Sequence, residues 1–212
     1  MKDIPIFTTD YGVASILLKE IPYRELAYIL VQGVQPGMIR ELIGECVDFC
    51  RAAGAERVLA TGHPDLEQFP YHHSVLTMSG PAGFEPEANL WPVTEETVAK
   101  WREIYNHGMA GIDGAATLTR QDEKEIVASA GTYFVHREGK LLGIGWVKEE
   151  ELVCIVGTEP GAGKTVLKTL LTAQSGERIK LEVASTKTRA VRLYESLGFL
   201  QTGERDRWYQ VK

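Results

Sequence analysis

The stretch RAVRLYESLGFLQTGERDRWYQV, residues 189–211, carries the signals of a helix, a stop and a strand. Four apolar residues recur at helical spacing in its first half: Ala190, Leu193, Tyr194 and Leu197. Gly198 follows them, as is common where a helix ends, and RWYQV (207–211) is rich in strand-forming residues. The sequence therefore predicts an amphipathic helix over 186–196 and a terminal strand.

A second stretch, GTEPGAGKTVLKTLL (157–171), follows the apolar run LVCIV (152–156) and opens another helix. The backbone N–H groups of Gly161–Thr165 would be the unpaired donors of a helix N-terminus, which attract anions. A phosphate-binding P-loop is one candidate, because Gly163, Lys164 and Thr165 match its end. Position 158, where that motif needs glycine, holds Thr158, and no apolar strand ending in Asp follows to hold magnesium. The P-loop is therefore the less favoured alternative.

The glycine- and proline-rich segment 79–87 suggests a boundary between residues 1–80 and residues 89–212. Both parts contain an apolar strand, the pattern Gly-x-x-Pro-Gly, an amphipathic helix and another strand. The offset is constant, since Gly33 and Gly157, like Pro36 and Pro160, are 124 residues apart. This repetition favours duplication of one strand–helix–strand unit, with residues 1–80 as a degenerate, non-catalytic partial copy.

The composition is that of an ordinary globular chain: 212 residues, 44% hydrophobic and 25% charged, with a net charge of −6. This acidic balance argues against nucleic acid or an anionic membrane as a partner, and it is compatible with a cationic substrate. The three cysteines match no disulfide or zinc pattern, so no metal is expected. With no leader sequence or membrane-spanning run in view, a cytoplasmic location is expected.

The tail around Leu193-Tyr194-Glu195 and Gly198-Phe199 resembles the closing signature of the GNAT N-acyltransferase superfamily. The turn Gly161-Ala162-Gly163, followed by Val166, Leu167, Leu170 and Leu171, is similar to that family's GxGxxLLxxLL motif. The resemblance covers residues 89–212. It implies an α/β (α+β) fold: a mixed, strongly twisted sheet flanked by helices, in which acyl-coenzyme A lies between the separated fourth and fifth strands.

Site residues follow from the same resemblance. The strand end Ile155-Val156-Gly157 would hydrogen-bond the pantetheine arm, and the turn Gly161-Ala162-Gly163-Lys164-Thr165 would hold the pyrophosphate. A backbone N–H on the fourth strand would stabilise the oxyanion. Tyr194 is the positional match for the general acid, although its apolar stripe is equally typical of a packed aromatic residue. Lys187 stands where the family often has Asn, and it is included among the cofactor-binding residues.

The general base stays open. Glu150 and Glu151 precede the fourth strand and are more typical of a solvated turn, and His136 lies on an expected strand. His72 and His73 are expected to be structural or at the surface, and Cys154 is expected in the core rather than as an acyl carrier. Thr158 departs from the family, which usually has Arg or Gln there, and the loop is shorter than usual.

The resemblance thus implies an N-acetyltransferase that transfers the acetyl group of acetyl-CoA to a primary amine by direct attack. The amine could be a small molecule or a peptide. The alternative is a non-catalytic acyl-CoA-binding or interaction module that retains the fold.

Overall fold

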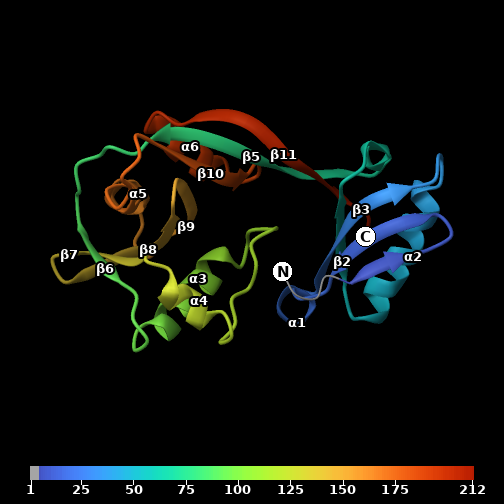
Figure 1. Ribbon diagram of the computed structural model, residues 1–212, viewed down its shortest axis with the longest axis horizontal. Coiled ribbons are helices and arrows are strands. Elements are labelled where there is room, and N and C mark those ends of the chain that lie inside the picture. The colour runs from blue at the N-terminus through green and yellow to red at the C-terminus, as the bar shows by residue number, and fades with distance from the viewer. Residues whose placement is uncertain (1–4) are drawn as a thin grey trace. The chain divides into compact units, whose positions relative to one another are not determined.

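The computed structural model describes residues 5–212, in which eleven strands form one mixed sheet accompanied by six α-helices (Figure 1). The strand order is β1-β2-β3-β4-β11-β5-β10-β9-β8-β7-β6. The chain divides into two compact units: unit 1 comprises residues up to Val75 and Glu204–Lys212, and unit 2 comprises Leu76–Gly203. The α+β fold with a mixed sheet agrees with the fold class expected from the sequence. Residues 1–4 of the expected domain 1–80 lie outside the described residues.

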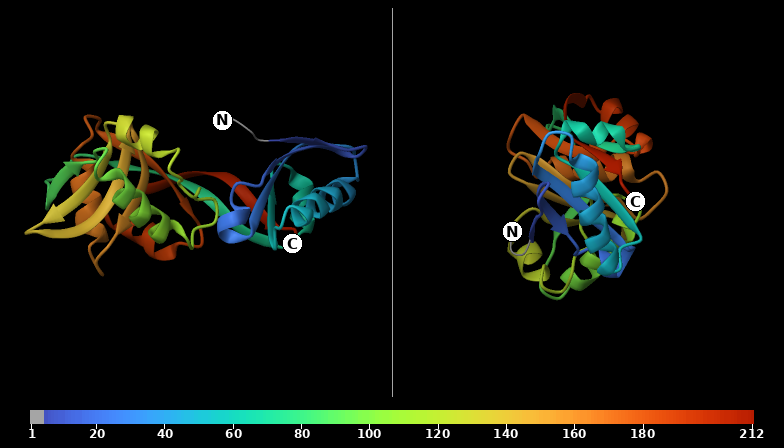
Figure 2. Two further views of the ribbon diagram at one scale, coloured as in Figure 1. Left: turned by 90° about the horizontal axis from the view of Figure 1, so that it is seen from below. Right: turned by 90° about the vertical axis from the view of Figure 1, so that its right-hand side faces the viewer.

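Unit 1 is built from an antiparallel pair followed by a strand–helix–strand segment. Its elements are β1 (Ile6–Thr8), β2 (Gly12–Leu17), α1 (Ile21–Arg24), β3 (Leu26–Val34), α2 (Ile39–Ala52), β4 (Arg57–Thr61) and the short 3₁₀ helix η1 (Pro64–Gln68). Helix α2 buries a stripe of Leu42, Ile43, Cys46 and Cys50 against one face of the strands, where it appears as the light-blue helix beside the blue strands (Figure 2). The helical spacing of these apolar residues accounts for both the helix and the face that it buries.

Unit 2 contains the second half of the chain except its last residues. Its elements are β6 (Asn89–Pro92), α3 (Val98–Met109), α4 (Glu123–Ala128), β7 (Thr132–Arg137), β8 (Lys140–Lys148), β9 (Glu151–Gly157), α5 (Gly163–Leu171), β10 (Arg178–Ala184) and α6 (Thr188–Ser196). Strands β6 to β9 pair antiparallel, and β9 pairs with β10 in parallel.

Two helical layers cover opposite faces of the central strands of unit 2. Helix α5 packs Leu167 and Leu170 into a core that also contains Tyr194 and Phe199. Helix α3 packs Trp101 and Tyr105 on the other face, with Cys154 of β9. Figure 1 shows α5 on one side of β8 and β9, and α3 with α4 on the other. Strand β9 therefore lies between two layers, which suits its nearly continuous apolar sequence.

Two long strands contribute residues to both units: β5 (Tyr71–Pro81) and β11 (Leu200–Gln210). Sequence reasoning did not assign β5, because its His, Ser and Gly residues interrupt an apolar alternation. Gly80 of β5 is required by packing, since a Cβ there would lie 2.4 Å from the ring of Phe199. The compact units thus differ from the expected boundaries: residues 76–88 belong with unit 2, and residues 204–212 with unit 1.

The repeated segments noted in the sequence have matching geometry. Gly37 and Gly161 both have left-handed backbone angles, with φ of 79° and 81°. Helices α2 and α5 begin two residues after these glycines, and in each unit the strand before the helix runs parallel to the strand after it. The two pairs differ in length: β3 and β4 pair over five residues, from Leu26↔Arg57 to Leu30↔Thr61, whereas β9 and β10 pair over two. Duplication itself stays a prediction.

Helix α3 follows a short polar turn. The helix begins at Val98, directly after a turn over 95–97. The Thr94 hydroxyl, just before this turn, donates to the Glu96 carboxylate over 2.7 Å. The polar side chains thus stabilise a turn that leads into the helix, a common alternative for Thr residues near a helix start.

Candidate active site

The centre of the site is the point where β9 and β10 stop pairing. Their register pairs are Lys180↔Glu151 and Leu181↔Leu152, although β9 continues to Gly157 and β10 to Ala184. A β-bulge in β9 marks this point, because Leu152 pairs with Val147 and Cys154 with Trp146, which leaves Val153 as the extra residue. A bulge bends the bulged strand away from its neighbour. The backbone of residues 154–157 is thereby released from β10.

The glycine turn follows directly after this released strand. Thr158 N–H donates to the Leu142 carbonyl, Ala162 N–H to the Glu159 carbonyl, and the hydrogen-bond ladder of α5 begins with Val166 N–H donating to Ala162. The N–H groups of Gly163, Lys164 and Thr165 precede this first helical bond, so they form the positive end of the helix. Gly157 faces the start of this helix, since a Cβ there would lie 3.8 Å from the Gly163 nitrogen. The backbone donors are therefore gathered at the end of β9.

Tyr194 is brought to the same region by α6. Its side chain is buried in the core below α5, with its ring 5.8 Å from that of Phe199. Burial raises the pKa of the Tyr194 hydroxyl to about 12, and Cys154 of β9 adds a smaller effect in the same direction. Burial also raises the pKa of the Cys154 thiol to about 12. Tyr194 and Cys154 are thus near one another, and both are held in their neutral forms.

Helix α3 covers the opposite face of the released strand. A Cβ at Gly108 would lie 2.4 Å from Val156 Cγ1, so the absence of a side chain allows the helix to rest on the end of β9. From the last turn of the helix, Asn106 Nδ2 donates to the Leu118 carbonyl over 2.8 Å and its Oδ1 accepts from Leu118 N–H over 2.9 Å. This amide clip gives the connection between α3 and α4 a defined path.

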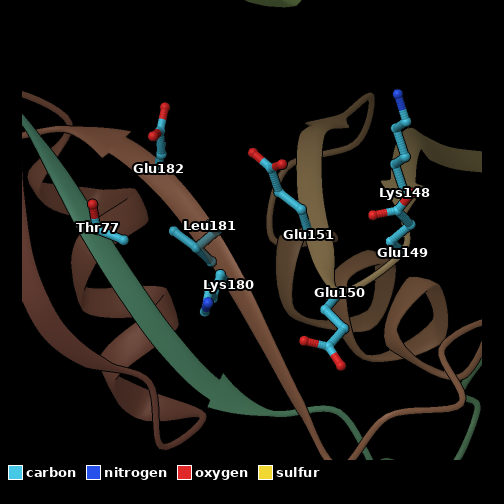
Figure 3. Close-up of a pocket in the computed structure, with 8 residues that line it drawn as sticks. All are labelled: Thr77, Lys148, Glu149, Glu150, Glu151, Lys180, Leu181 and Glu182. Carbon is cyan, nitrogen blue, oxygen red and sulfur yellow. The ribbon is translucent and has the colours of Figure 1, made fainter.

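A hollow of about 540 Å³ lies at the paired ends of β9 and β10, on the other side of the bulge from the glycine turn. Its lining consists of Thr77, Lys148, Glu149, Glu150, Glu151, Lys180, Leu181 and Glu182. Figure 3 shows the carboxylates of Glu151 and Glu182 extending in the same direction from facing strands, while Glu150 extends away from them. With four carboxylates and two ammonium groups, the lining is net acidic.

Glu151 differs from the other carboxylates that precede it in the lining. It is the first residue of β9 rather than part of a turn, and Glu149 and Glu150 make the turn. Its register partner is Lys148, and the next pair along, Leu152 with Val147, packs on the α5 side of the sheet. Because of the bulge, Glu151 and Cys154 share the other face, which α3 covers. Sequence reasoning considered Glu151, but the bulge that orients it gave no sequence signal.

Other residues singled out in the sequence lie elsewhere. Lys187 Nζ donates to the carbonyl of Gly111, in the connection after α3. His136 of β7 lies against the exposed Trp91, with ring centroids 5.8 Å apart. His72 and His73, on β5 in unit 1, contact each other through Nδ1 atoms 2.8 Å apart, and His73 is stacked on Trp208. The structural role expected for this histidine pair agrees with the burial of His73.

Two sets of side-chain hydrogen bonds around the glycine turn were not predicted from the sequence. The Thr158 hydroxyl donates to the Leu141 carbonyl over 2.7 Å, so this side chain fastens the turn to β8. Glu87 accepts from Thr165 Oγ1 over 2.9 Å and from Lys168 Nζ over 2.6 Å. These hydrogen bonds hold the pKa of the Glu87 carboxyl below its ordinary value, with Lys168 as the main cause. Segment 82–88 is thereby held along α5. The only sequence signal for this contact is the helical spacing of Thr165 and Lys168, which places both side chains on one face of α5.

Known structures resemble the chain over most of its length. A GCN5-related N-acetyltransferase from Sphaerobacter thermophilus aligns with a TM-score of 0.54 and 14% identity, over 93% of this chain and 75% of that one. A putative acetyltransferase from Pyrococcus horikoshii aligns with a TM-score of 0.56 and 14% identity, over 95% and 70%. A GCN5-related N-acetyltransferase from Anabaena variabilis gives 0.60 and 13%, over 94% and 59%.

This chain has the GNAT fold. The separated parallel strands and the glycine turn of unit 2 are the parts of the GNAT fold that the sequence resemblance had implied. No family model matches the sequence, and neither does any curated protein. At the identities above, the likeness establishes the GNAT fold without naming a substrate.

Residues 5–212 contain no group of three or more His, Cys, Asp or Glu side chains arranged to hold a metal ion. No helix in this part of the chain has the length and apolar character needed to cross a bilayer.

Proposed function

We propose that the chain is an acetyl-CoA-dependent N-acetyltransferase with one active site, in unit 2. The observation that carries the proposal is the separation of β9 from β10 beside a buried Tyr194. In a parallel sheet, unpaired backbone groups at such a gap need hydrogen-bond partners. An extended pantetheine arm supplies amide groups for Ile155, Val156 and Gly157. The Gly161–Thr165 turn, with Ala162, Gly163 and Lys164 between, would hold the pyrophosphate through backbone N–H groups.

The proposed chemistry is direct attack. The neutral amine nitrogen attacks the thioester carbonyl, the C–S bond breaks, and the thiolate leaves with the electron pair. Tyr194 gives its proton to this thiolate. A raised pKa of about 12 would make Tyr194 a weak acid toward a thiolate in water. Burial also raises the pKa of the neighbouring Cys154 thiol, and the same desolvation of a leaving thiolate would favour its protonation by Tyr194.

The proton lost by the amine needs an acceptor, and Glu151 is the proposed one, directly or through water. It lies on the same sheet face as Cys154, and Glu182 extends beside it. The acidic lining of the hollow favours a positively charged amine over an acidic one, because opposite charges raise local concentration. Lys187 was expected among the cofactor-binding residues, and in the structure its side chain donates to the Gly111 carbonyl.

The first test is ligand binding. Acetyl-CoA is expected to raise Tm, because a ligand of the native state stabilises it by mass action, and ATP with magnesium is the matched control. Stabilisation by ATP–magnesium without stabilisation by acetyl-CoA would contradict the proposal. The second test is release of free coenzyme A thiol, measured with a thiol reagent across a panel of polyamines, amino acids and peptides.

The alternative is a non-catalytic acyl-CoA-binding module. The bond from Thr158 to Leu141 favours it, because position 158, where the family usually has Arg or Gln, holds a threonine whose hydroxyl is tied to β8. Acetyl-CoA binding without thiol release across the amine panel would support the alternative and exclude the enzyme.

A further inference from the structure

Lys187 lies at the junction between β10 and α6. Its backbone opens the helix, since Ala190 N–H and Val191 N–H both donate to the Lys187 carbonyl. Its side chain leaves this junction, and Nζ donates to the carbonyl of Gly111, two residues beyond the end of α3. The bond thus joins segments that are 76 residues apart in sequence.

The two segments belong to opposite sides of the gap between β9 and β10. Gly111 follows α3, which rests on the end of β9 through Gly108 and Val156. Lys187 follows β10, whose last pair with β9 is at Leu181. The Lys187–Gly111 bond therefore links the β9 side of the open strand ends to the β10 side.

The connection between α3 and α4 is shaped by local hydrogen bonds as well. Ile112 N–H donates to the Met109 carbonyl over 2.9 Å, and Ala115 N–H to the Ile112 carbonyl over 3.2 Å. At its far end, the Asn106 side chain clips Leu118. Lys187 adds a charged donor from α6 to this set, and hydrogen bonds with a charged partner are stronger than neutral ones.

We infer that Lys187 is a positioning residue that orders the connection 110–118 over the gap before any cofactor binds. This inference rests on the proposed function for the meaning of the gap. A thioester in the gap has α5 and α6 on one side, so an amine must approach from the side that α3 and this connection cover. Ordering the connection in advance removes an entropy cost from amine binding. The role differs from the cofactor contact expected from the sequence.

The test compares three variants by amide hydrogen exchange in the free protein and by acetyl-CoA binding. Lys187→Met removes the donor and keeps most of the aliphatic length, Lys187→Arg keeps a charged donor, and Lys140→Met on the β7–β8 hairpin is the charge control. Lys187→Met is expected to speed exchange over 110–118 about fivefold, the effect of losing one hydrogen bond with a charged donor. Lys187→Arg is expected to restore the slow exchange, and Lys140→Met to leave it unchanged.

Acetyl-CoA binding provides the discriminating readout. The Kd of Lys187→Met is expected to stay within about threefold of the unmodified chain, because the proposed role is exerted on the connection and not on the cofactor. Unchanged exchange over 110–118 in Lys187→Met overturns the inference. If acetyl-CoA affinity also falls tenfold or more while exchange is unchanged, Lys187 is a cofactor ligand instead. If the unmodified chain does not bind acetyl-CoA, the proposed function fails while the exchange measurement still decides the role of Lys187.

Discussion

Gly108 of α3 and Val156 of β9 are in direct van der Waals contact, with no room for a side chain at position 108. A Cβ there would lie 2.4 Å from Val156 Cγ1 and 2.8 Å from its Cγ2. This contact fixes the distance between the helix and the strand end that is proposed to bind the pantetheine arm. The helix on one face of the gap is therefore held in position by a residue that has no side chain.

Gly108→Ala is expected to destabilise the fold by about 1–3 kcal/mol, the usual cost of overpacking a tight contact. Acetyl-CoA affinity should fall as well, because either α3 or Val156 must move. Thermal unfolding and calorimetric titration measure the two effects. Gly111→Ala is the control, since the nearest atom to its added Cβ is Lys187 Nζ at an ordinary 3.9 Å.

The double variant Gly108→Ala/Val156→Ala separates crowding from helix propensity. Removing the two methyl groups of Val156 makes space for the new Cβ, so the two changes should be non-additive. The contact does not position α3 if Gly108→Ala alone leaves the stability unchanged. The same conclusion follows if the losses of stability caused by the two substitutions simply add.

Tyr194→Phe is expected to lower kcat by about 10²-fold or more, the usual contribution of a general acid, while the Kd of acetyl-CoA changes little. The pH dependence follows from the raised pKa. Tyr194 donates only when protonated, and with a pKa of about 12 it stays protonated throughout the neutral and mildly alkaline range. Any loss of kcat below pH 10 must then come from another group. An unchanged kcat in Tyr194→Phe would remove this residue from the mechanism.

The chain is expected to bind a single equivalent of acetyl-CoA. Strands β3 and β4 of unit 1 stay paired up to Leu30↔Thr61. Gly62, directly after β4, lies so close to β3 that a Cβ at this position would be 2.5 Å from the Val31 carbonyl oxygen. The gap that opens between β9 and β10 is thus closed by strand pairing at the matching place in unit 1. Calorimetric titration gives the stoichiometry, and a value near two would show that unit 1 binds the cofactor as well.

Glu87→Gln is expected to lower Tm by about 1–2 °C at neutral pH, a small effect because the ion pair with Lys168 lies at the surface and is partly open to solvent. The folded state lowers the pKa of Glu87, so its contribution to stability is present above the ordinary carboxyl pKa and is lost as the pH falls through the folded-state value. The difference in Tm between the variant and the unmodified chain should therefore shrink in acid. Glu85→Gln, an exposed carboxylate in the same segment, is the control, and an equal effect there would show that Glu87 has no specific role.

The three cysteines are expected to resist thiol reagents in the native protein. All are buried, and burial raises the pKa of Cys46 and Cys154 to about 12 and that of Cys50 to about 11. Thiolate, the reactive form, is therefore scarce at neutral pH. A thiol reagent should label three groups per chain only after denaturation. Rapid native labelling would place at least one thiol at the surface, and it would also disturb the thiol-release assay.

The parts of the fold that were predicted from the sequence are those with strong local patterns. The apolar stripe of α2, with Leu42, Cys46 and Cys50, and that of α5, with Leu167 and Leu170, specify both the helices and the faces that they bury. The pattern Gly-x-x-Pro-Gly, which ends at Gly37 and at Gly161, predicted turns, and both glycines have the left-handed φ angles that glycine adopts readily. Strand β5 was not predicted because it contains His73 and Ser74, which are polar but buried by the residues around them. The alternation of polar and apolar residues in a sequence does not show that a polar residue is buried.

By itself the sequence determined the strand–turn–helix order, the anion-attracting turn at Gly161–Thr165 and the helix that carries Tyr194, because each depends on residues close together in the chain. Tertiary structure alone decided that β9 leaves β10 after Leu152, that Tyr194 lies near Cys154, and that Lys187 reaches Gly111. Strand separation depends on a bulge and on pairing between distant segments, and the burial that raises a pKa depends on every layer packed around the group. These are properties of the assembled core, so no local pattern specifies them.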